Sequence, residues 1–435
     1  MLGNNEGYET RRIIRHVLLA ILAIMSISLS WLIWTNPARY GGSRHIANEK
    51  VQSNQVKRDM SDVILPTQII YTNHDKQQLV NNSKKNLPKM IVAEVSKWRL
   101  ESSTRVSRGN KERFMDYATM DRSVMLKYPS NITTQIFNGV YDQKLNSNYE
   151  ISQVVINLDK RNEFFLLNDK TYDVYQIKVS RQNLKNLRQL VQGNDQVYAV
   201  KETVMNHRLI NDYYKAPAVP YNSFLINEES SSVFTANLLT NTDAESIDTK
   251  KTKDGVVYVT NDNTKRLLVR NNGQVTFNNA SGNGGGDGLN NNIEKSFLQM
   301  KQLGVQADTN VRYFDFQLAK RQAEFRDYVA GFPIFNEDGL GTIKVARQSN
   351  ELTTSFSIYN LQVPVPSKGG TKQLPTTEEV LNQLSYQGIN PKDIKDIEIG
   401  YQWAGKVAAN TTVELEPTWY VNYRGEWTAY QNLAS

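Results

Sequence analysis

An uninterrupted apolar run near the N-terminus constrains this chain more than any other feature. Residues 17–34 read VLLAILAIMSISLSWLIW and contain no charge, proline or glycine. As a helix the run would extend roughly 27 Å, close to the thickness of the hydrocarbon core of a bilayer. The sequence therefore predicts one transmembrane helix over residues 17–34.

The residues that flank this run predict its orientation. Basic residues before a span favour the cytoplasmic side, and indole rings favour the interface between membrane and water. The run has both signals: Arg11, Arg12, Arg15, Trp31 and Trp34. We therefore predict that residues 1–16 are cytoplasmic. The bulk of the chain would lie outside a cell membrane that it crosses once, with these five residues at the lipid interface.

A cleaved signal peptide is the alternative interpretation of the same run. Ser28-Leu29-Ser30 offers a weak small-residue cleavage site. However, the apolar part of a signal peptide usually has about 7–15 residues, and cleavage here would leave Trp-Leu-Ile-Trp at the start of the mature chain. The sequence favours an uncleaved anchor.

The composition excludes several classes of function. The chain of 435 residues has no cysteine and four histidines, so disulfides, thiolate metal sites and cysteine nucleophiles are excluded, and no two histidines have the spacing of metal ligands. It contains neither Gly-x-Ser-x-Gly nor Ser-x-x-Lys. The net charge of +7 suits anionic lipid headgroups or wall polymers better than nucleic acid. We predict no cofactor, no metal and no catalytic residues.

The polar and apolar patterns divide the exterior into segments. Eleven of the fifteen residues in 278–292 are Asn or Gly, which predicts a linker. The segments are a juxtamembrane tether (35–63), an N-terminal domain (64–142), a central α+β domain (143–277), the linker (278–292) and a C-terminal α+β domain (293–435). The predicted fold class is α+β, with antiparallel sheets and packed helices.

Local patterns predict the individual elements. Helices are expected over residues 88–99, 131–140, 181–192, 230–239, 293–303 and 376–384. Strands are expected over residues 66–73, 123–128, 151–159, 163–168, 172–179, 256–260, 266–270, 274–277, 311–318, 324–335, 342–348, 352–361, 394–403, 412–423 and 427–430.

Three short patterns resemble functional motifs. Residues 400–406 have the spacing of a phosphate loop, but Val407 stands where a serine or threonine would bind magnesium. Residues 284–287 resemble one copy of a calcium-binding glycine repeat, which functions only in many copies. Glu414 and Glu416 share one strand face and could form a glycosidase pair. A strand, a linker and a solvated pair of carboxylates are the simpler interpretations.

The predicted membrane helix carries a face of small residues. At 100° per residue, Ala20, Ala23, Ser26 and Ser30 fall within roughly 120° of one another. Small residues allow another helix to approach closely, and serine can donate a hydrogen bond across the contact. We predict that this face binds a partner helix.

Four stretches of the chain resemble the YycH (WalH) regulatory proteins of low-GC Gram-positive bacteria. They read LSWLIWTNP (29–37), FRDYVAGFPIF (325–335), IEIGYQW (397–403) and VELEPTWYVNYRGEW (413–427). The central region, 150–280, is similar in pattern rather than in residues. The Asn/Gly tract is an insertion relative to that pattern.

The resemblance implies a non-enzymatic, single-pass regulator. Family members associate with the sensor histidine kinase WalK (YycG) and with the sister protein YycI, and so modulate two-component signalling that controls cell-wall metabolism. Their contact with the kinase is thought to run largely through the transmembrane helices, which correspond here to residues 17–34. An extracytoplasmic structural protein that binds wall polymers or lipid headgroups remains the alternative. The ligand of the exterior region, if any, is not predicted.

Overall fold

A computed structural model describes residues 58–239, 247–280, 288–304, 310–348, 350–403 and 411–433, together with residues 16, 19, 22, 23, 25 and 26. The chain divides into two compact units, residues 1–52 and residues 53–435. The description below concerns the second unit. It has the predicted mixed α+β class, with antiparallel sheets against which helices pack.

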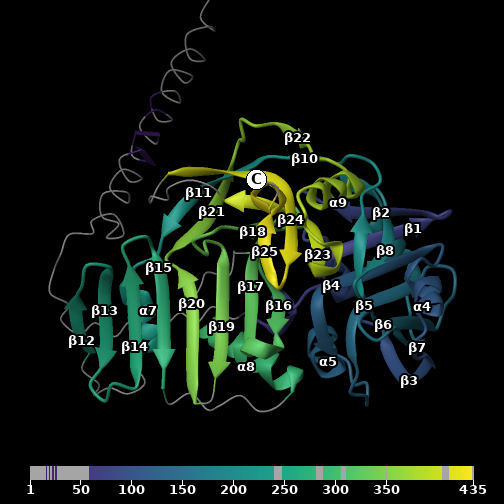
Figure 1. The fold of residues 1–435 in the computed structure, drawn as a ribbon, viewed down its shortest axis with the longest axis horizontal. Helices are drawn as coiled ribbons and strands as arrows, with labels where there is room; N and C mark the ends of the chain where they lie inside the picture. The colour runs from purple at the N-terminus through teal and green to yellow at the C-terminus, as the bar shows by residue number, and fades with distance from the viewer. Residues whose placement is uncertain are drawn as a thin grey trace, which may run out of the picture. The chain divides into compact units, whose positions relative to one another are not determined.

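The first half of this unit forms a nine-stranded sheet (Figure 1). In spatial order its strands are β3 (Arg99–Ser107), β7 (Asp173–Ser180), β6 (Glu163–Asn168), β5 (Glu150–Asn157), β4 (Ser123–Thr133), β1 (Gln68–Asn73), β2 (Lys76–Asn81), β8 (Gln196–Met205) and β9 (Arg208–Asp212). The predicted domain boundary at residue 142 falls between β4 and β5, which pair with each other.

Both faces of this sheet are covered. Seven of the eight residues of β5 are buried, because helices lie on one face and a second apolar core lies on the other. The helices of this half are α2 (Met60–Val63), α3 (Leu87–Val95), α4 (Lys111–Ala118), α5 (Thr134–Tyr141) and α6 (Leu184–Val191). Buried residues of α3, α5 and α6 share one core, whereas Phe114 of α4 belongs to the other.

The second half forms a fourteen-stranded sheet. Its main path is β12 (Ile247–Lys251), β13 (Gly255–Thr260), β14 (Lys265–Arg270), β15 (Gln274–Asn279), β20 (Glu351–Ser357), β19 (Thr342–Gln348), β17 (Gln322–Val329), β18 (Phe332–Phe335), β23 (Ile394–Trp403), β24 (Thr412–Tyr423), β11 (Asn222–Glu228) and β21 (Tyr359–Val365). Two strands lie off this path: β16 (Val311–Gln317) pairs with β17, and β25 (Glu426–Ala429) pairs with β24.

Smaller elements complete this half. A two-stranded sheet pairs β10 (Ala218–Pro220) with β22 (Thr371–Gln373). The helices are α7 (Ser231–Leu238), α8 (Leu289–Gln302), α9 (Thr377–Tyr386) and α10 (Tyr430–Leu433), with the short 3₁₀ turns η2 (Leu318–Lys320) and η3 (Pro391–Asp393). Phe234 of α7 packs edge-on against Phe356 of β20, at 4.9 Å between ring centroids.

Helix α9 confirms one sequence signal in detail. The Thr376 side chain accepts a hydrogen bond from the Glu379 amide at 3.3 Å, and the Glu379 carboxylate accepts one from the Thr376 amide at 2.7 Å. This reciprocal capping box satisfies two amides that the helix leaves unpaired. The helix therefore begins where the sequence predicted.

The predicted strand 324–335 is wrong in one respect, because it is a hairpin. The turn between β17 and β18 consists of Ala330 and Gly331, both at positive φ (49° and 83°). Two residues with positive φ form the tight turn that suits the twist of paired strands. The two turn residues are Ala-Gly rather than Asn-Gly or Asp-Gly, so the strongest short-range hairpin signal is absent from the sequence. The predicted strand 352–361 likewise divides, into β20 and β21.

Within the described residues, no helix combines the length and apolar character needed to cross a membrane. Leu19, Leu22, Ala23, Met25 and Ser26 are helical. The other predicted site residues of that segment (Arg11, Arg12, Arg15, Ala20, Ser30, Trp31 and Trp34) lie outside the described residues, as do the tract 281–287 and residues 404–410.

Candidate functional site

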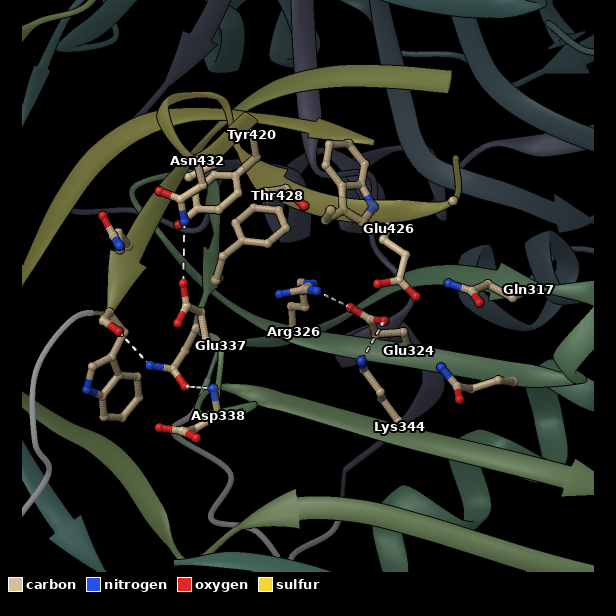
Figure 2. Close-up of a pocket in the computed structure, with 18 of the residues that line it drawn as sticks. Gln317, Glu324, Arg326, Glu337, Asp338, Lys344, Tyr420, Glu426, Thr428 and Asn432 are labelled. Carbon is tan, nitrogen blue, oxygen red and sulfur yellow. Dashed lines mark hydrogen bonds and ion pairs between the residues drawn. The ribbon is translucent and has the colours of Figure 1, made fainter. Parts of the chain in front are cut away.

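Three of the four stretches that resemble the YycH proteins meet at one groove. Residues 325–335 form β17 and β18, residues 397–403 lie in β23, and residues 413–427 span β24 and the start of β25. Side chains from all three line a hollow of about 530 Å³, which we call the aromatic groove (Figure 2). The stretches are distant in sequence, and the large sheet brings them together.

Stacked rings form one wall of the aromatic groove. The rings of Phe335 and Tyr420 are parallel within 17°, with their centroids 3.8 Å apart. The guanidinium of Arg326 lies 4.2 Å from the Phe335 ring and 4.7 Å from the Phe314 ring. Trp427 contacts both phenylalanines, at 5.5 and 5.7 Å between centroids. This cation–π assembly holds a buried arginine in a fixed position.

Charges of both signs surround these rings. Glu324 forms an ion pair with Arg326 and lies 3.9 Å from Lys344, as Figure 2 shows. Lys320 and Glu426 form a looser pair at 3.8 Å. The lining contains no histidine, cysteine or serine among the residues described. A surface with charges of both signs beside aromatic rings can bind a polar segment reversibly.

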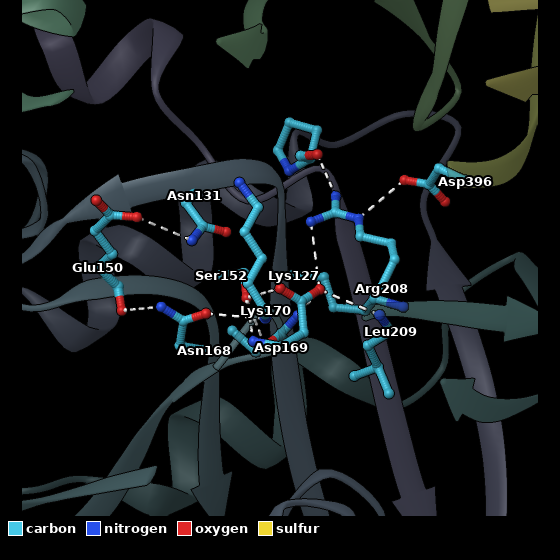
Figure 3. A network of polar contacts seen from close by, with 12 residues as sticks. Lys127, Asn131, Glu150, Ser152, Asn168, Asp169, Lys170, Arg208, Leu209 and Asp396 are labelled. Atoms are coloured by element: carbon cyan, nitrogen blue, oxygen red, sulfur yellow. Dashed lines mark hydrogen bonds and ion pairs between the residues drawn. The ribbon is translucent and has the colours of Figure 1, made fainter. Parts of the chain in front are cut away.

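A second cleft lies on the other side of Trp427, between the two sheets. It has a volume of about 650 Å³, and both sheets contribute to its lining. Arg208 of β9 donates to Asp396 of β23 at 2.9 Å and lies 3.3 Å from Asp169 (Figure 3). It also donates to the carbonyl of Pro129. Although burial opposes the charge, Asp169 and Asp396 raise the pKa of Arg208 above its ordinary value.

A buried chain of polar contacts continues across the same junction. Lys127 Nζ lies 2.8 Å from Glu202 Oε2 and donates to Asn211 at 2.6 Å. Asn211 donates to Gln68, and Gln68 donates in turn to Glu398 of β23. Burial raises the pKa of Glu202, which Lys127 partly counteracts. The hydrogen bond from Gln68 to Glu398 and the ion pair of Arg208 with Asp396 thus tie the nine-stranded sheet to the larger one.

Two of the three motif-like patterns have structural explanations, whereas residues 284–287 lie outside the described residues. Gly400 lies inside β23, and a Cβ there would come 2.6 Å from the Phe335 ring. Gly405 and Lys406 lie outside the described residues. The Glu414 carboxylate accepts from Ser367 and from the amides of Lys368 and Gly369. These hydrogen bonds, with that of Ser367 first, lower the pKa of Glu414.

The partner of Glu414 in the predicted glycosidase pair is also engaged. Glu416 accepts from Lys372 at 2.6 Å. The two carboxylates therefore bind different parts of the segment 367–372. In the part of the chain that the structure describes, no group of three or more acidic or histidine side chains could hold a metal ion.

None of the groove residues was predicted as a site from the sequence. The available signal was indirect, because the groove is lined by the stretches on which the family resemblance depends. The predicted partner-binding face is only partly described: Ala23 and Ser26 are helical, whereas Ala20 and Ser30 are not described.

Comparison with solved structures identifies the fold. The chain superposes on the crystal structure of YycH from Bacillus subtilis with a TM-score of 0.68 and 16% identity, over 86% of this chain and 98% of that one. An uncharacterized protein from Eubacterium rectale has a TM-score of only 0.30 and 11% identity, over 49% of this chain and 81% of that one. No curated protein matches the chain.

Family models cover nearly the whole sequence. The model of the YycH protein N-terminal domain matches residues 12–196, and that of the YycH protein C-terminal domain matches residues 210–434. These two ranges correspond to the nine-stranded sheet up to β8 and to the half that contains the fourteen-stranded sheet. The chain belongs to the YycH family.

Proposed function

We propose that this protein is a membrane-anchored, non-enzymatic regulator of a sensor histidine kinase of the WalK (YycG) type. It associates with the kinase and with a YycI-like protein, and it modulates two-component signalling that controls cell-wall metabolism. The observation that carries the proposal is the match of both YycH domains over residues 12–196 and 210–434. YycH proteins as a family are regulators of the WalK system.

The character of the grooves supports a regulator rather than an enzyme. In the two grooves Arg208, Glu324 and Arg326 are each paired with an opposite charge, and Arg326 also packs on aromatic rings. The two motif-like carboxylates, Glu414 and Glu416, bind a neighbouring segment. These contacts hold the exterior region together, and they are compatible with a surface that binds a partner.

The proposed mechanism is a bias on a signalling equilibrium. Residues 17–34 pack beside the membrane helices of the kinase through Ala20, Ala23, Ser26 and Ser30, with residues 1–16 in the cytoplasm and the two-sheet region outside. A partner that displaces the exterior region changes how this helix packs. A coupling free energy of about 1–3 kcal/mol would change kinase output from several-fold to about a hundredfold.

Affinity capture from solubilised membranes tests the proposal. The native chain is compared with a variant in which residues 17–34 are replaced by leucine. A matched control restores only Ala20, Ala23, Ser26 and Ser30 in the leucine helix. We expect the kinase to be captured by the native chain, lost with the leucine helix and recovered with the control.

Other outcomes would redirect or refute the proposal. Capture by all three chains would place the contact in the exterior region, where Trp427→Ala then tests the aromatic groove. Absence of a histidine kinase from every capture would refute the regulator and would favour a protein that binds wall polymers or lipid headgroups.

A further inference from the structure

A small hollow beside the N-terminus of α3 is lined by three cations and no acid. It has a volume of about 180 Å³ and lies between the loop that precedes α3 and the turn that joins β17 to β18. The polar side chains that line it include Asn82, Lys84, Lys85, Asn86, Asn310 and Arg312. No carboxylate is among its described lining residues, in contrast to the aromatic groove.

Arg312 is the centre of this cationic hollow. Arg312 is only 6% exposed to solvent, and this burial lowers the pKa of its guanidinium to about 10. Its guanidinium lies 5.5 Å from the Tyr328 ring and donates to Asn86 Oδ1 at 3.2 Å and to the Pro66 carbonyl at 3.5 Å. These two bonds use two of its five N–H groups. Within the described residues it forms no ion pair.

Three other cations in the interior of this protein are paired with acids. Lys127 forms an ion pair with Glu202, Arg208 with Asp169 and Asp396, and Arg326 with Glu324. The register of β16 and β17 places Arg312 directly opposite Arg326, so the neighbouring strand supplies a like charge. A buried charge without a counter-ion lowers the stability of the folded state unless a ligand provides the counter-ion.

Two acids on the elements that surround the hollow do not take that role. Asp327 follows Arg326 and therefore points to the opposite face of β17, where Arg58 is the charge that acts on it. Asp195 accepts a hydrogen bond from the Ser83 amide and interacts electrostatically with Lys84, but it does not line the hollow. Lys84 and Lys85 are exposed at the rim.

The helix end by itself adds little. The Leu87 amide already donates to the Lys85 carbonyl, Pro88 has no amide hydrogen, and the Lys89 amide donates to Asn86 Oδ1. Recognition would therefore come from the guanidinium, the two lysines and the asparagine amides. An arginine fork with flexible ammonium groups at the rim suits an oxyanion that accepts several hydrogen bonds.

We infer that the cationic hollow binds an oxyanion of the phosphate class, with the Arg312 guanidinium as its buried anchor and Lys84 and Lys85 as its rim. The volume accommodates several water-sized groups, which is sufficient for one phosphate group. The site lies where Asn81 of β2 donates to the Ala330 carbonyl in the turn of the large sheet. Bound anion would therefore strengthen the junction between the two sheets.

Calorimetric titration of the full-length protein in detergent tests this inference, with inorganic phosphate as the probe and ionic strength held constant by sodium chloride. We expect saturable binding. Arg312→Gln should weaken it by about tenfold to a hundredfold, the range for hydrogen bonds to a charged group. Arg312→Lys keeps the charge and should retain part of the affinity. Lys178→Gln, at an exposed position on β7, is the matched control and should bind as the native chain does.

A rim variant covers the case in which Arg312→Gln does not fold. Lys84→Gln with Lys85→Gln changes two exposed side chains and should weaken phosphate binding several-fold. Absence of saturable binding to the native chain would overturn the inference. Equal affinity of the native chain and the rim variant, or of a folded Arg312→Gln variant, would overturn it as well.

Two further probes identify the source of the phosphate. Binding of soluble glycerol phosphate that depends on Arg312 supports a free phosphate ester. Binding to phosphatidylglycerol vesicles but not to phosphatidylcholine vesicles, with the same dependence, supports a lipid headgroup. Binding that does not depend on Arg312 in either case contradicts the site.

Discussion

Replacing Lys127 with methionine should show how strongly the buried ion pair of Lys127 and Glu202 stabilises the nine-stranded sheet. The Lys127 side chain is 6% exposed and its partner Glu202 is fully buried, with 2.8 Å between Nζ and Oε2. Methionine preserves most of the volume but leaves the Glu202 carboxylate without its cation. Breaking a buried pair from one side typically costs about 3–5 kcal/mol of unfolding free energy.

The loss should depend on pH, and its sign follows from Glu202. Burial already raises the pKa of Glu202, and Lys127 lowers it. Without Lys127 the folded pKa rises further above the unfolded value of about 4.3. Below that unfolded value the carboxyl is protonated in both states, so the electrostatic penalty is small. The penalty grows as the pH rises through the window between the unfolded and the folded pKa.

Urea unfolding of the full-length chain at pH 5 and pH 8, followed by tryptophan fluorescence, measures this difference. Lys144→Met, which removes an exposed lysine, is the matched control. The double variant Lys127→Met with Glu202→Gln should recover a large part of the loss at pH 8. The reasoning would be refuted if Lys127→Met were as stable as the control at pH 8. An equal penalty at both pH values would refute its electrostatic origin.

Two further predictions concern Gly400 and Asp327. Gly400→Ala should lower the unfolding free energy by about 1–3 kcal/mol, because its Cβ would lie 2.6 Å from the Phe335 ring and 2.9 Å from the Pro333 carbonyl oxygen. Gly139→Ala in α5, where the nearest atom is 3.8 Å away, should instead be neutral or stabilising by up to about 1 kcal/mol; equal losses in urea unfolding would contradict the packing argument. Burial raises the pKa of Asp327 to about 7, and one of its oxygens lacks a hydrogen-bond partner within the described residues. The native chain should therefore lose stability as the pH rises from about 4 to 7, and Asp327→Asn should flatten this slope; parallel urea-midpoint curves for the two chains would exclude Asp327 as the cause.

Local signals predicted those elements whose stability depends on their own residues. The Thr376–Glu379 capping box marked the start of α9, and Pro88 lies in the first turn of α3. Strands with strong apolar patterns, such as β5 and β23, were also predicted. No sequence pattern predicted β3, whose residues are mostly exposed because it is an edge strand of the nine-stranded sheet. Its existence depends on pairing with β7.

The apolar run 17–34, the absence of cysteine and the family resemblance are properties that the sequence determined by itself, because hydropathy, composition and residue order need no tertiary contact to be recognised. The groove around Phe335, the pairing of Lys127 and the burial of Arg312 were decided only by the tertiary structure. Each of these three features depends on contacts between residues that lie tens to hundreds of positions apart in the sequence. An isolated lysine or arginine in a sequence is most simply expected at the surface, and only the packing of two sheets shows which ones are buried and which of these lack a counter-ion.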